Sequence, residues 1–238
     1  MNIAILGYGK MGEQVEKAAL ERKHKIVAYI DNEKDWSKYI GKLKQADMAI
    51  DFSTPQVVVQ NIYKCFELNL PIVVGTTGWH QQINTVKEKC LQENQSLIYA
   101  FNFALGVNLF FALNKALAKI MSGYDEFDVS IEEIHHTEKK DSPSGTSIVL
   151  AKDIMKYLPQ KETWTNELND NVSELSIKSE RIKNNIGTHI VTYSSPLDVI
   201  EITHKSLSRK NFAIGAVLAA EWLTGKKGFF NISEMLNV

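Results

Sequence analysis

The sequence predicts an α/β protein with two domains, the first built on a doubly wound parallel sheet and the second an α+β domain with its own sheet. Three observations lead to this prediction. Short apolar runs alternate with helical stretches over the first hundred residues, a glycine-rich turn follows the first run, and the pattern changes near residue 105. A chain of 238 residues can form one large domain or two smaller ones.

Five apolar runs in the first hundred residues are predicted to be strands buried on both faces. The runs are NIAIL, KIVAYI, MAIDF, PIVVGT and SLIYAFN. Helical stretches such as Gly12–Arg22 and Gln56–Leu68 separate them. Continuous apolar runs that alternate with helices favour a parallel sheet covered by helices on both faces. We therefore assign residues 1–104 to a first domain.

The second domain is predicted over residues 105–214, where helices and strands no longer alternate regularly. Leu105–Met121 has apolar residues at helical spacing, and a second helix is expected over Thr146–Tyr157. The polar stretch 160–174 is expected to be a loop. The predicted strands are DVSIEEIHH, LSIKSERI, GTHIVTYSS and DVIEITHKS. The short connections between the last three of these strands indicate an antiparallel or mixed sheet.

The last part of the chain returns to a helical pattern. Phe212–Leu223 is predicted to be a helix, and Thr224 and Gly225 after it are typical of a helix end. We expect residues 215–238 to pack back on the first domain.

Composition and charge argue against several classes of protein. The net charge is −1, which gives no basic excess for nucleic acid or for an anionic membrane. The apolar run 104–113 is too short to span a bilayer, and the N-terminus lacks the features of a secretion signal, so a cytoplasmic protein is expected. Cys65 and Cys90 have neither disulfide nor zinc spacing.

The turn ILGYGKMG indicates a dinucleotide site. Gly7, Gly9 and Gly12 follow a strand in G-x-G-x-x-G order and open a helix, whose N-terminus attracts a pyrophosphate. Asp31 ends the second predicted strand, where a carboxylate meets the ribose hydroxyls and disfavours a 2′-phosphate. Lys10 and Lys34 could offset that repulsion, so the sequence favours NADH and leaves NADPH open.

Loops at the carboxyl ends of the other predicted strands are expected at the same crevice. They are DFSTP (51–55), GTTGW (75–79) and AFNF (100–103). In the second of these loops, hydroxyl groups and bare backbone are expected where a nicotinamide would lie.

The stretch IEEIHHTEKKDSPSGT, residues 131–146, concentrates ionisable groups before a predicted helix. The N-terminus of that helix offers free N–H groups and a favourable dipole to an anion. His135 and Lys139 are residue types that can donate a proton or stabilise developing negative charge. The acids here form no recognised metal-ligand spacing with the histidines, so no metal is expected.

Several segments together resemble the dihydrodipicolinate reductase family. They are GYGKMG, DFSTP, VVGTTGW, AFNFALGVN, EIHHTEKKDSPSGT and THKSLSRKNFAIGAVLAAEWL, and they occur in the family's order. The resemblance implies a Rossmann domain completed by the C-terminal helix and a central substrate domain whose open mixed sheet builds a homotetramer. It implies reduction, in lysine biosynthesis, of a cyclic imine formed from pyruvate and aspartate semialdehyde, with NADH or NADPH as hydride donor.

The resemblance also implies roles for individual residues. His135 and Lys139 are the expected catalytic residues, and the expected substrate contacts are His136, Ser144, Gly145 and Thr146. The expected cofactor contacts are Gly7, Tyr8, Gly9, Lys10, Met11, Gly12, Asp31, Gly75, Thr76, Thr77, Ala100, Phe101, Asn102 and Phe103. One feature departs from the family: its glycine loop usually has one residue more than the turn Gly7-Tyr8-Gly9.

Two other functions remain open at this stage. Another two-domain reductase of small acids, such as an aspartate dehydrogenase-like enzyme, would share the glycine loop but would not need the Ser-Gly-Thr turn beside paired histidines. A nucleotide-sensing protein would bind NADH without turnover.

Overall fold

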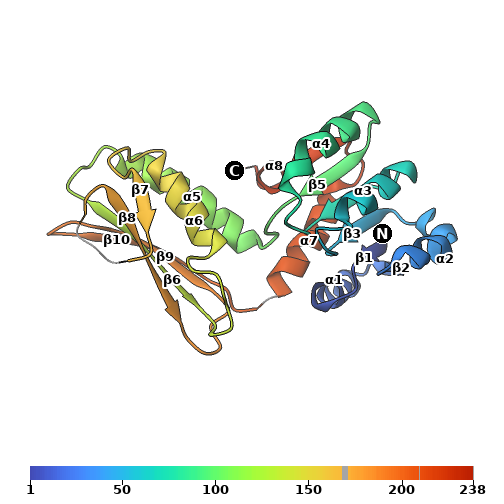
Figure 1. Ribbon diagram of the computed structural model, residues 1–238, viewed down its shortest axis with the longest axis horizontal. Coiled ribbons are helices and arrows are strands. Elements are labelled where there is room, and N and C mark those ends of the chain that lie inside the picture. The colour runs from blue at the N-terminus through green and yellow to red at the C-terminus, as the bar shows by residue number, and fades with distance from the viewer. Residues whose placement is uncertain (168–170, 209, 238) are drawn as a thin grey trace. The chain divides into compact units, whose positions relative to one another are not determined.

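The computed structural model describes residues 1–167, 171–208 and 210–237, which form two compact units (Figure 1). Unit 1 comprises residues 1–105 and 210–238, and unit 2 comprises residues 106–209.

Unit 1 is a doubly wound α/β fold. Its six strands lie in the order β11-β5-β4-β3-β1-β2, and every pairing is parallel. The strands are β1 (Asn2–Leu6), β2 (Lys25–Ile30), β3 (Met48–Asp51), β4 (Ile72–Val74), β5 (Ser96–Tyr99) and β11 (Gly228–Asn231). The helices are α1 (Lys10–Glu21), α2 (Glu33–Leu43), α3 (Val58–Glu67), the short η1 (His80–Gln82), α4 (Ile83–Gln92), α7 (Lys210–Leu223) and α8 (Ile232–Leu236).

Two apolar cores cover the two faces of this sheet. Residues of α1 and α7 pack on one face, and residues of α2, α3 and α4 pack on the other. Helix α7 is tightly docked, because a Cβ atom on Gly215 would lie 1.7 Å from the Phe103 carbonyl oxygen. The segment after residue 209 is thus part of the first unit's core.

Unit 2 is an α+β fold with a mixed sheet in the order β10-β9-β6-β8-β7. Strand β6 (Asp128–His135) lies in the middle, antiparallel to β9 (Thr188–Ser194) and parallel to β8 (Glu174–Arg181). The outer strands are β10 (Val199–Lys205) and β7 (Thr163–Thr165). Helices α5 (Leu105–Met121) and α6 (Gly145–Met155) lie side by side on one face of the sheet (Figure 1).

The fold class predicted from the sequence is confirmed, with three local differences. Strand β7 lies inside the stretch 160–174 that was expected to be a loop, of which residues 168–170 lie outside the described part. Strand β11 and helix α8 follow α7 and were not predicted; β11 extends the first sheet by pairing with β5. Gly225 ends α7 with a φ of 77°, as a glycine helix end requires.

Among the described residues, no helix combines the length and the apolar character that a membrane crossing needs.

Candidate active site

The glycine loop of unit 1 requires glycine at two positions. Gly7 has a φ of 83°, and a Cβ atom there would lie 2.6 Å from the Phe52 carbonyl oxygen. A Cβ atom on Gly12 would lie 2.4 Å from the Gly7 carbonyl oxygen, because α1 packs closely on the loop. Gly9, the N-cap of α1, has a φ of −93° and nothing within 4 Å of a Cβ atom. The loop therefore leaves open space at the N-terminus of α1.

This open space adjoins a pocket of about 500 Å³. Its lining includes Gly7, Gly9 and Asp31 from the predicted cofactor residues, and Ser53, Thr54 and Asn61 from the loop and helix after β3. The Asp31 carboxylate is exposed and accepts a hydrogen bond from the Tyr8 N–H group at 3.0 Å. An open helix N-terminus with a carboxylate at the end of β2 fits a nicotinamide dinucleotide in this pocket.

A buried carboxylate, Asp51, holds the neighbouring loops together. It is 0% exposed, and it accepts hydrogen bonds from the hydroxyl groups of Ser53 at 2.8 Å and Thr76 at 2.6 Å and from the Asn61 amide at 2.8 Å. Burial raises the pKa of Asp51 above its usual range, although these hydrogen bonds oppose that effect. The Thr76 hydroxyl, expected to face the nucleotide, is thus committed to Asp51.

The remaining predicted cofactor residues lie near the same loops. Lys10 and Met11 begin α1, and the segments 75–77 and 100–103 follow β4 and β5 at the carboxyl edge of the sheet. A Cβ atom on Gly75 would lie 2.3 Å from the Phe52 ring, and Phe103 also contacts that ring. Thr77 and Phe101 are exposed, whereas Ala100 and Phe103 are buried.

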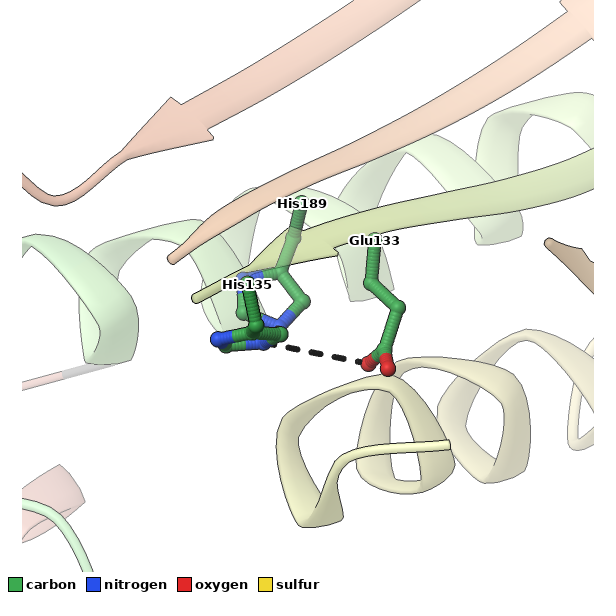
Figure 2. A group of neighbouring side chains, drawn as sticks. All are labelled: Glu133, His135 and His189. Atoms are coloured by element: carbon green, nitrogen blue, oxygen red, sulfur yellow. Dashed lines mark hydrogen bonds and ion pairs between the residues drawn. The ribbon is translucent and has the colours of Figure 1, made fainter. Parts of the chain in front are cut away.

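In unit 2, strand register places three ionisable side chains on one face of the sheet. Glu133 of β6 pairs with His189 of β9 and with Ser179 of β8, and His135 pairs with Arg181. Alternate residues of a strand share a face, so Glu133 and His135 both point toward the helices (Figure 2). His136, the next residue, is half-buried.

The two buried histidine rings lie edge to face. Their centroids are 5.1 Å apart, and the Nε2 atoms of His135 and His189 are separated by 3.4 Å. The Nε2 atom of His135 is 3.9 Å from the Glu133 carboxylate, and its Nδ1 atom lies 3.4 Å from the Ile186 carbonyl oxygen. Burial lowers the pKa of both histidines, and that of His189 falls to about 3. Both rings are therefore neutral at physiological pH.

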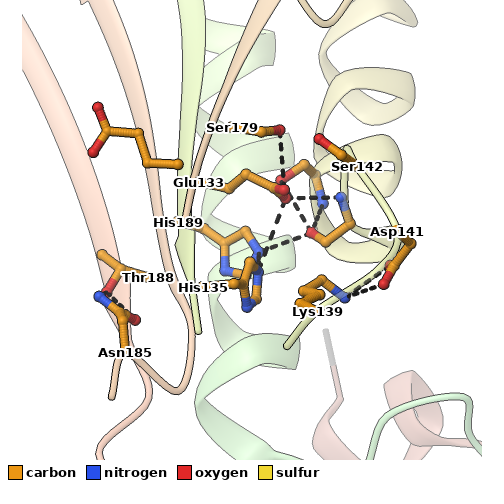
Figure 3. Close-up of polar contacts among 12 residues, drawn as sticks. Glu133, His135, Lys139, Asp141, Ser142, Ser179, Asn185, Thr188 and His189 are labelled. Atoms are coloured by element: carbon orange, nitrogen blue, oxygen red, sulfur yellow. Dashed lines mark hydrogen bonds and ion pairs between the residues drawn. The ribbon is translucent and has the colours of Figure 1, made fainter. Parts of the chain in front are cut away.

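The Glu133 carboxylate is fully buried and lies among hydroxyl groups such as that of Ser179 (Figure 3). Its hydrogen bonds come from three serines and Arg181. Oε2 accepts from the Ser144 N–H group at 2.8 Å and from the Ser147 hydroxyl at 2.7 Å. Oε1 accepts from the Ser179 hydroxyl at 3.0 Å and from the Arg181 guanidinium at 3.3 Å. Burial alone would raise the pKa of Glu133, but the hydrogen bonds from the serines outweigh burial and lower it to about 2.

Glu133, His135 and His189 come close enough together to hold a metal ion, with all three ligand atoms within 4.8 Å. The hydrogen bonds argue against that use. Both oxygens of the carboxylate are already bound by donors, and one of those donors is a cation, which would repel a metal ion. The cluster is better described as a hydrogen-bonded support for α6.

Helix α6 presents an open N-terminus in the same region. Ser144 is its N-cap, and the Ser144 side chain accepts from the Ser147 N–H group. Gly145 is exposed and Thr146 half-buried, and as the first two helical residues they have no carbonyl of the helix to bond. Their N–H groups can donate hydrogen bonds to an anion.

Ser144 differs from these two residues in its surroundings. It is 2% exposed, its N–H group is bound to Glu133, and its hydroxyl lies 3.1 Å from Nε2 of His189. Its backbone and hydroxyl were expected to contact substrate, and both are engaged within the protein. Lys139 lies in the loop before α6, with Nζ 2.7 Å from the Asp141 carboxylate.

The structure adds Arg181 and His189 to the residues considered from the sequence, and it places Glu133, considered there only among the acids of the segment, at the centre of the cluster. Arg181 also donates to the Asp141 carbonyl oxygen at 2.6 Å, so it holds the loop that carries Lys139. A sequence signal existed for Glu133, since it alternates with His135 on a predicted strand. No sequence signal indicated His189 or Arg181, because the strand register alone brings their side chains next to Glu133 and His135.

A doubly wound sheet with an open helix N-terminus after its first strand, together with a second unit that carries ionisable groups beside another open helix N-terminus, is typical of a pyridine-nucleotide-dependent oxidoreductase. Family models of the dihydrodipicolinate reductase N-terminus and C-terminus match residues 1–103 and 106–236. The chain belongs to the dihydrodipicolinate reductase family. The family predicted from the sequence is thereby confirmed, and with it a reductase of lysine biosynthesis through diaminopimelate.

Individual relatives agree over the full length. The 4-hydroxy-tetrahydrodipicolinate reductase of Christiangramia forsetii is 46% identical over 237 residues, which cover 100% of this chain and 98% of the relative. That of Staphylococcus aureus is 34% identical over 248 residues, covering 99% of this chain and 100% of the relative. The fold matches dipicolinate-bound dihydrodipicolinate reductase from Paenisporosarcina sp. TG-14 with a TM-score of 0.78, at 24% identity and over 99% of both chains.

Proposed function

We propose that this chain reduces 4-hydroxy-tetrahydrodipicolinate to tetrahydrodipicolinate: NADH or NADPH donates the hydride, a proton is taken up, and the 4-hydroxyl group leaves as water. The observation that supports it most strongly is the open N-terminus of α6. It follows directly on the loop that carries Lys139, and it lies close to the buried His135. It offers separate groups for a carboxylate and for a proton, as a small cyclic dicarboxylate with a reducible carbon–nitrogen bond requires. The dipicolinate in the related structure is likewise a small cyclic dicarboxylate.

Different residues of unit 2 bind the carboxylate of such a substrate and transfer the proton. The N–H groups of Gly145 and Thr146 bind one carboxylate, aided by the dipole of α6. Lys139 compensates negative charge and donates a proton at the ring nitrogen, where electron density rises during reduction. His135, neutral and buried, orients the substrate or exchanges a proton, and His136 contacts it from the same loop.

The residues of unit 1 hold the nucleotide. When bound, the reduced nicotinamide supplies the hydride. Gly7, Gly9 and the N-terminus of α1 hold the pyrophosphate, and Asp31 binds the adenosine ribose hydroxyls. Since that carboxylate repels a 2′-phosphate, we propose that NADH is the preferred donor.

We also propose a homotetramer assembled through the sheet of unit 2. Among the described residues, no helix of unit 2 lies against the sheet face opposite α5 and α6 (Figure 1). The outer strand β10 itself carries exposed apolar residues, among them Val199 and Ile200. Light scattering coupled to gel filtration would give about four times the chain mass. A cytoplasmic location stays a prediction from the sequence.

A coupled assay tests the reaction. The substrate is generated in the cuvette by a synthase from pyruvate and aspartate semialdehyde, and oxidation of NADH or NADPH is followed by absorbance. We expect oxidation that requires both precursors and this chain. NADH binding without turnover would instead support the nucleotide sensor, and turnover with oxaloacetate and ammonium alone would support an aspartate dehydrogenase-like enzyme.

A further inference from the structure

The buried carboxylate of Glu133 has no part in the chemistry described above, although it lies beneath the proposed substrate seat. Its hydrogen bonds fall into two groups. Oε1 is held from the sheet by Ser179 (Figure 3) and Arg181. Oε2 is held from helix α6 by Ser144 and Ser147. One carboxylate thus ties the first turn of α6 to the central strand of the sheet.

The charge and burial of the Glu133 carboxylate determine which groups can bind it. A fully buried carboxylate is stable only with full hydrogen bonding or a cationic partner, and Arg181 supplies the cation. The Ser144 N–H group is a donor that an open helix N-terminus would otherwise offer to a ligand. Because Glu133 binds it, the open donors of this turn are those of Gly145 and Thr146.

The same turn is connected to the histidine pair. Ser147 donates its hydroxyl proton to Glu133, since a carboxylate only accepts, so Ser147 Oγ can accept from the Ser144 hydroxyl at 3.2 Å. Ser144 can then accept from Nε2 of His189, which lies 3.1 Å away. The buried Nδ1 atom of His189 has no partner among the described residues. With this direction Nδ1 carries an unpaired lone pair rather than an unpaired N–H group, which costs less free energy.

We propose that Glu133 is a positioning residue for substrate binding: by fixing Ser144 and Ser147 it aims the N–H groups of Gly145 and Thr146 at the substrate carboxylate. The proposal rests on the proposed function, because it takes the α6 N-terminus as the substrate seat. Glu133 acts through α6 and touches neither substrate nor cofactor.

The substitution Glu133→Gln separates the two sides of the carboxylate. The Arg181 guanidinium repels an amide NH₂ group and attracts the amide oxygen. The NH₂ group is therefore turned toward α6, where it meets the Ser144 N–H group donor to donor. The hydrogen bonds to the sheet survive, and the hydrogen bond from the Ser144 N–H group, which fixes the start of α6, is lost, because a backbone N–H group cannot accept.

The experiment measures binding of dipicolinate and of NADH separately, by titration calorimetry on the full-length protein. For Glu133→Gln we expect a dipicolinate Kd raised about tenfold or more, with the NADH Kd changed less than twofold. In steady state the substrate KM rises more than kcat falls. The matched control is Glu132→Gln: Glu132 precedes Glu133 on β6, faces the other side of the sheet and pairs with Lys178. It should bind both ligands as the wild type does.

A second pair of variants keeps the proposal testable if Glu133→Gln does not fold. Ser147→Ala removes one donor from α6, and Ser147→Thr keeps the hydroxyl. We expect Ser147→Ala to raise the dipicolinate Kd several-fold and Ser147→Thr to restore it. Wild-type dipicolinate affinity in folded Glu133→Gln, or in Ser147→Ala, would overturn the proposal. A wild-type protein that binds NADH but not dipicolinate would refute the proposed substrate, and the positioning role with it.

Discussion

Lys139 is half-buried, and its ammonium group is paired with a carboxylate of the protein. Both features suit a proton donor that exchanges this partner for the substrate. Its ammonium group is bound to the Asp141 carboxylate, which is itself exposed, and Lys139 lowers the pKa of Asp141. A substrate carboxylate can compete for this ammonium group because the Lys139–Asp141 pair is close to solvent and weak. Binding would then move the proton donor from Asp141 to the substrate.

The first prediction concerns this residue. Lys139→Ala should lower kcat by about 10²-fold or more, the usual contribution of a general acid, while the NADH Kd stays nearly constant. Steady-state kinetics and NADH fluorescence titration measure the two quantities. Asp141→Asn is the control variant: it removes the ion pair of Lys139 but keeps the ammonium group, so it should retain most of the activity. Wild-type kcat in Lys139→Ala would remove Lys139 from the mechanism.

The second prediction concerns cofactor choice. Asp31→Ala removes both the acceptor for the ribose hydroxyls and the repulsion of a 2′-phosphate, so kcat/KM should fall for NADH and should rise or stay constant for NADPH. A change of about tenfold in the ratio corresponds to about 1.4 kcal/mol. Both cofactors must be compared at one salt concentration, because surface charges are screened. An equal fall for both would mean that Asp31 does not discriminate.

The third prediction follows from the neutral His189. Its pKa is about 3 in the folded protein and 6.5 when unperturbed, so the unfolded state binds the extra proton as pH falls. Stability from this group is complete above pH 6.5 and is lost as pH falls toward 3, with about 2 kcal/mol lost by pH 5. In His189→Gln, urea unfolding at pH 7 and pH 5 should show a smaller difference than in wild type. Part of the difference remains, because His135 and His204 have lowered pKa values too. An unchanged difference would contradict the assignment.

Among the elements, those with a strong local pattern were predictable. The apolar runs of the first sheet indicated its strands, and the Ser-Gly-Thr turn indicated where α6 begins, because a serine N-cap is a local signal. Strands β7 and β11 were missed, since three or four residues are too few for a pattern and their pairing with β8 and β5 supports them.

The candidate site was predictable only as far as it is local in sequence. His135, Lys139 and the α6 N-terminus lie within one short segment, so spacing brought them together. Glu133 and His189 are 56 positions apart and meet because β6 and β9 pair in one register. A slip of one residue would turn His189 to the other face, and composition alone does not determine register.

The fourth prediction belongs to the loop between β1 and α1. Gly7→Ala places a side chain at a φ of 83° and against backbone of the next loop, which should cost about 2 kcal/mol of stability or more. In Gly9→Ala the added methyl group lies more than 4 Å from other atoms of the described residues, and Gly9 has an ordinary φ, so the melting temperature should stay near that of wild type. Its methyl group nevertheless lies where the pyrophosphate would approach, and NADH affinity should fall. Unchanged NADH affinity in Gly9→Ala would place the pyrophosphate elsewhere.

At the scale of the whole molecule, the chain leaves unit 1 and returns to it. Unit 2 is inserted between residues 105 and 210, and the returning segment supplies α7 and β11. Ala216, Val217 and Leu223 of α7 are fully buried in the core that also contains Ile3 and Ile50. Unit 1 is therefore complete only when both pieces are present.

The last prediction tests whether unit 1 is an independent nucleotide-binding domain. Joining residues 1–105 to 210–238 through a short Gly/Ser linker should give a protein that unfolds cooperatively, because the close packing of Gly215 on Phe103 shows that the two ends lie near each other. NADH affinity should stay within about tenfold of the full chain, since the lining of the pocket comes entirely from unit 1. Residues 1–105 alone should not fold, as they leave one face of the sheet without α7 and its apolar surface exposed to water. Circular dichroism melting and NADH fluorescence titration of the two proteins decide the matter. If the joined protein folds but does not bind NADH, the nucleotide needs groups from residues 106–209, and the placement of the whole cofactor site in unit 1 is wrong.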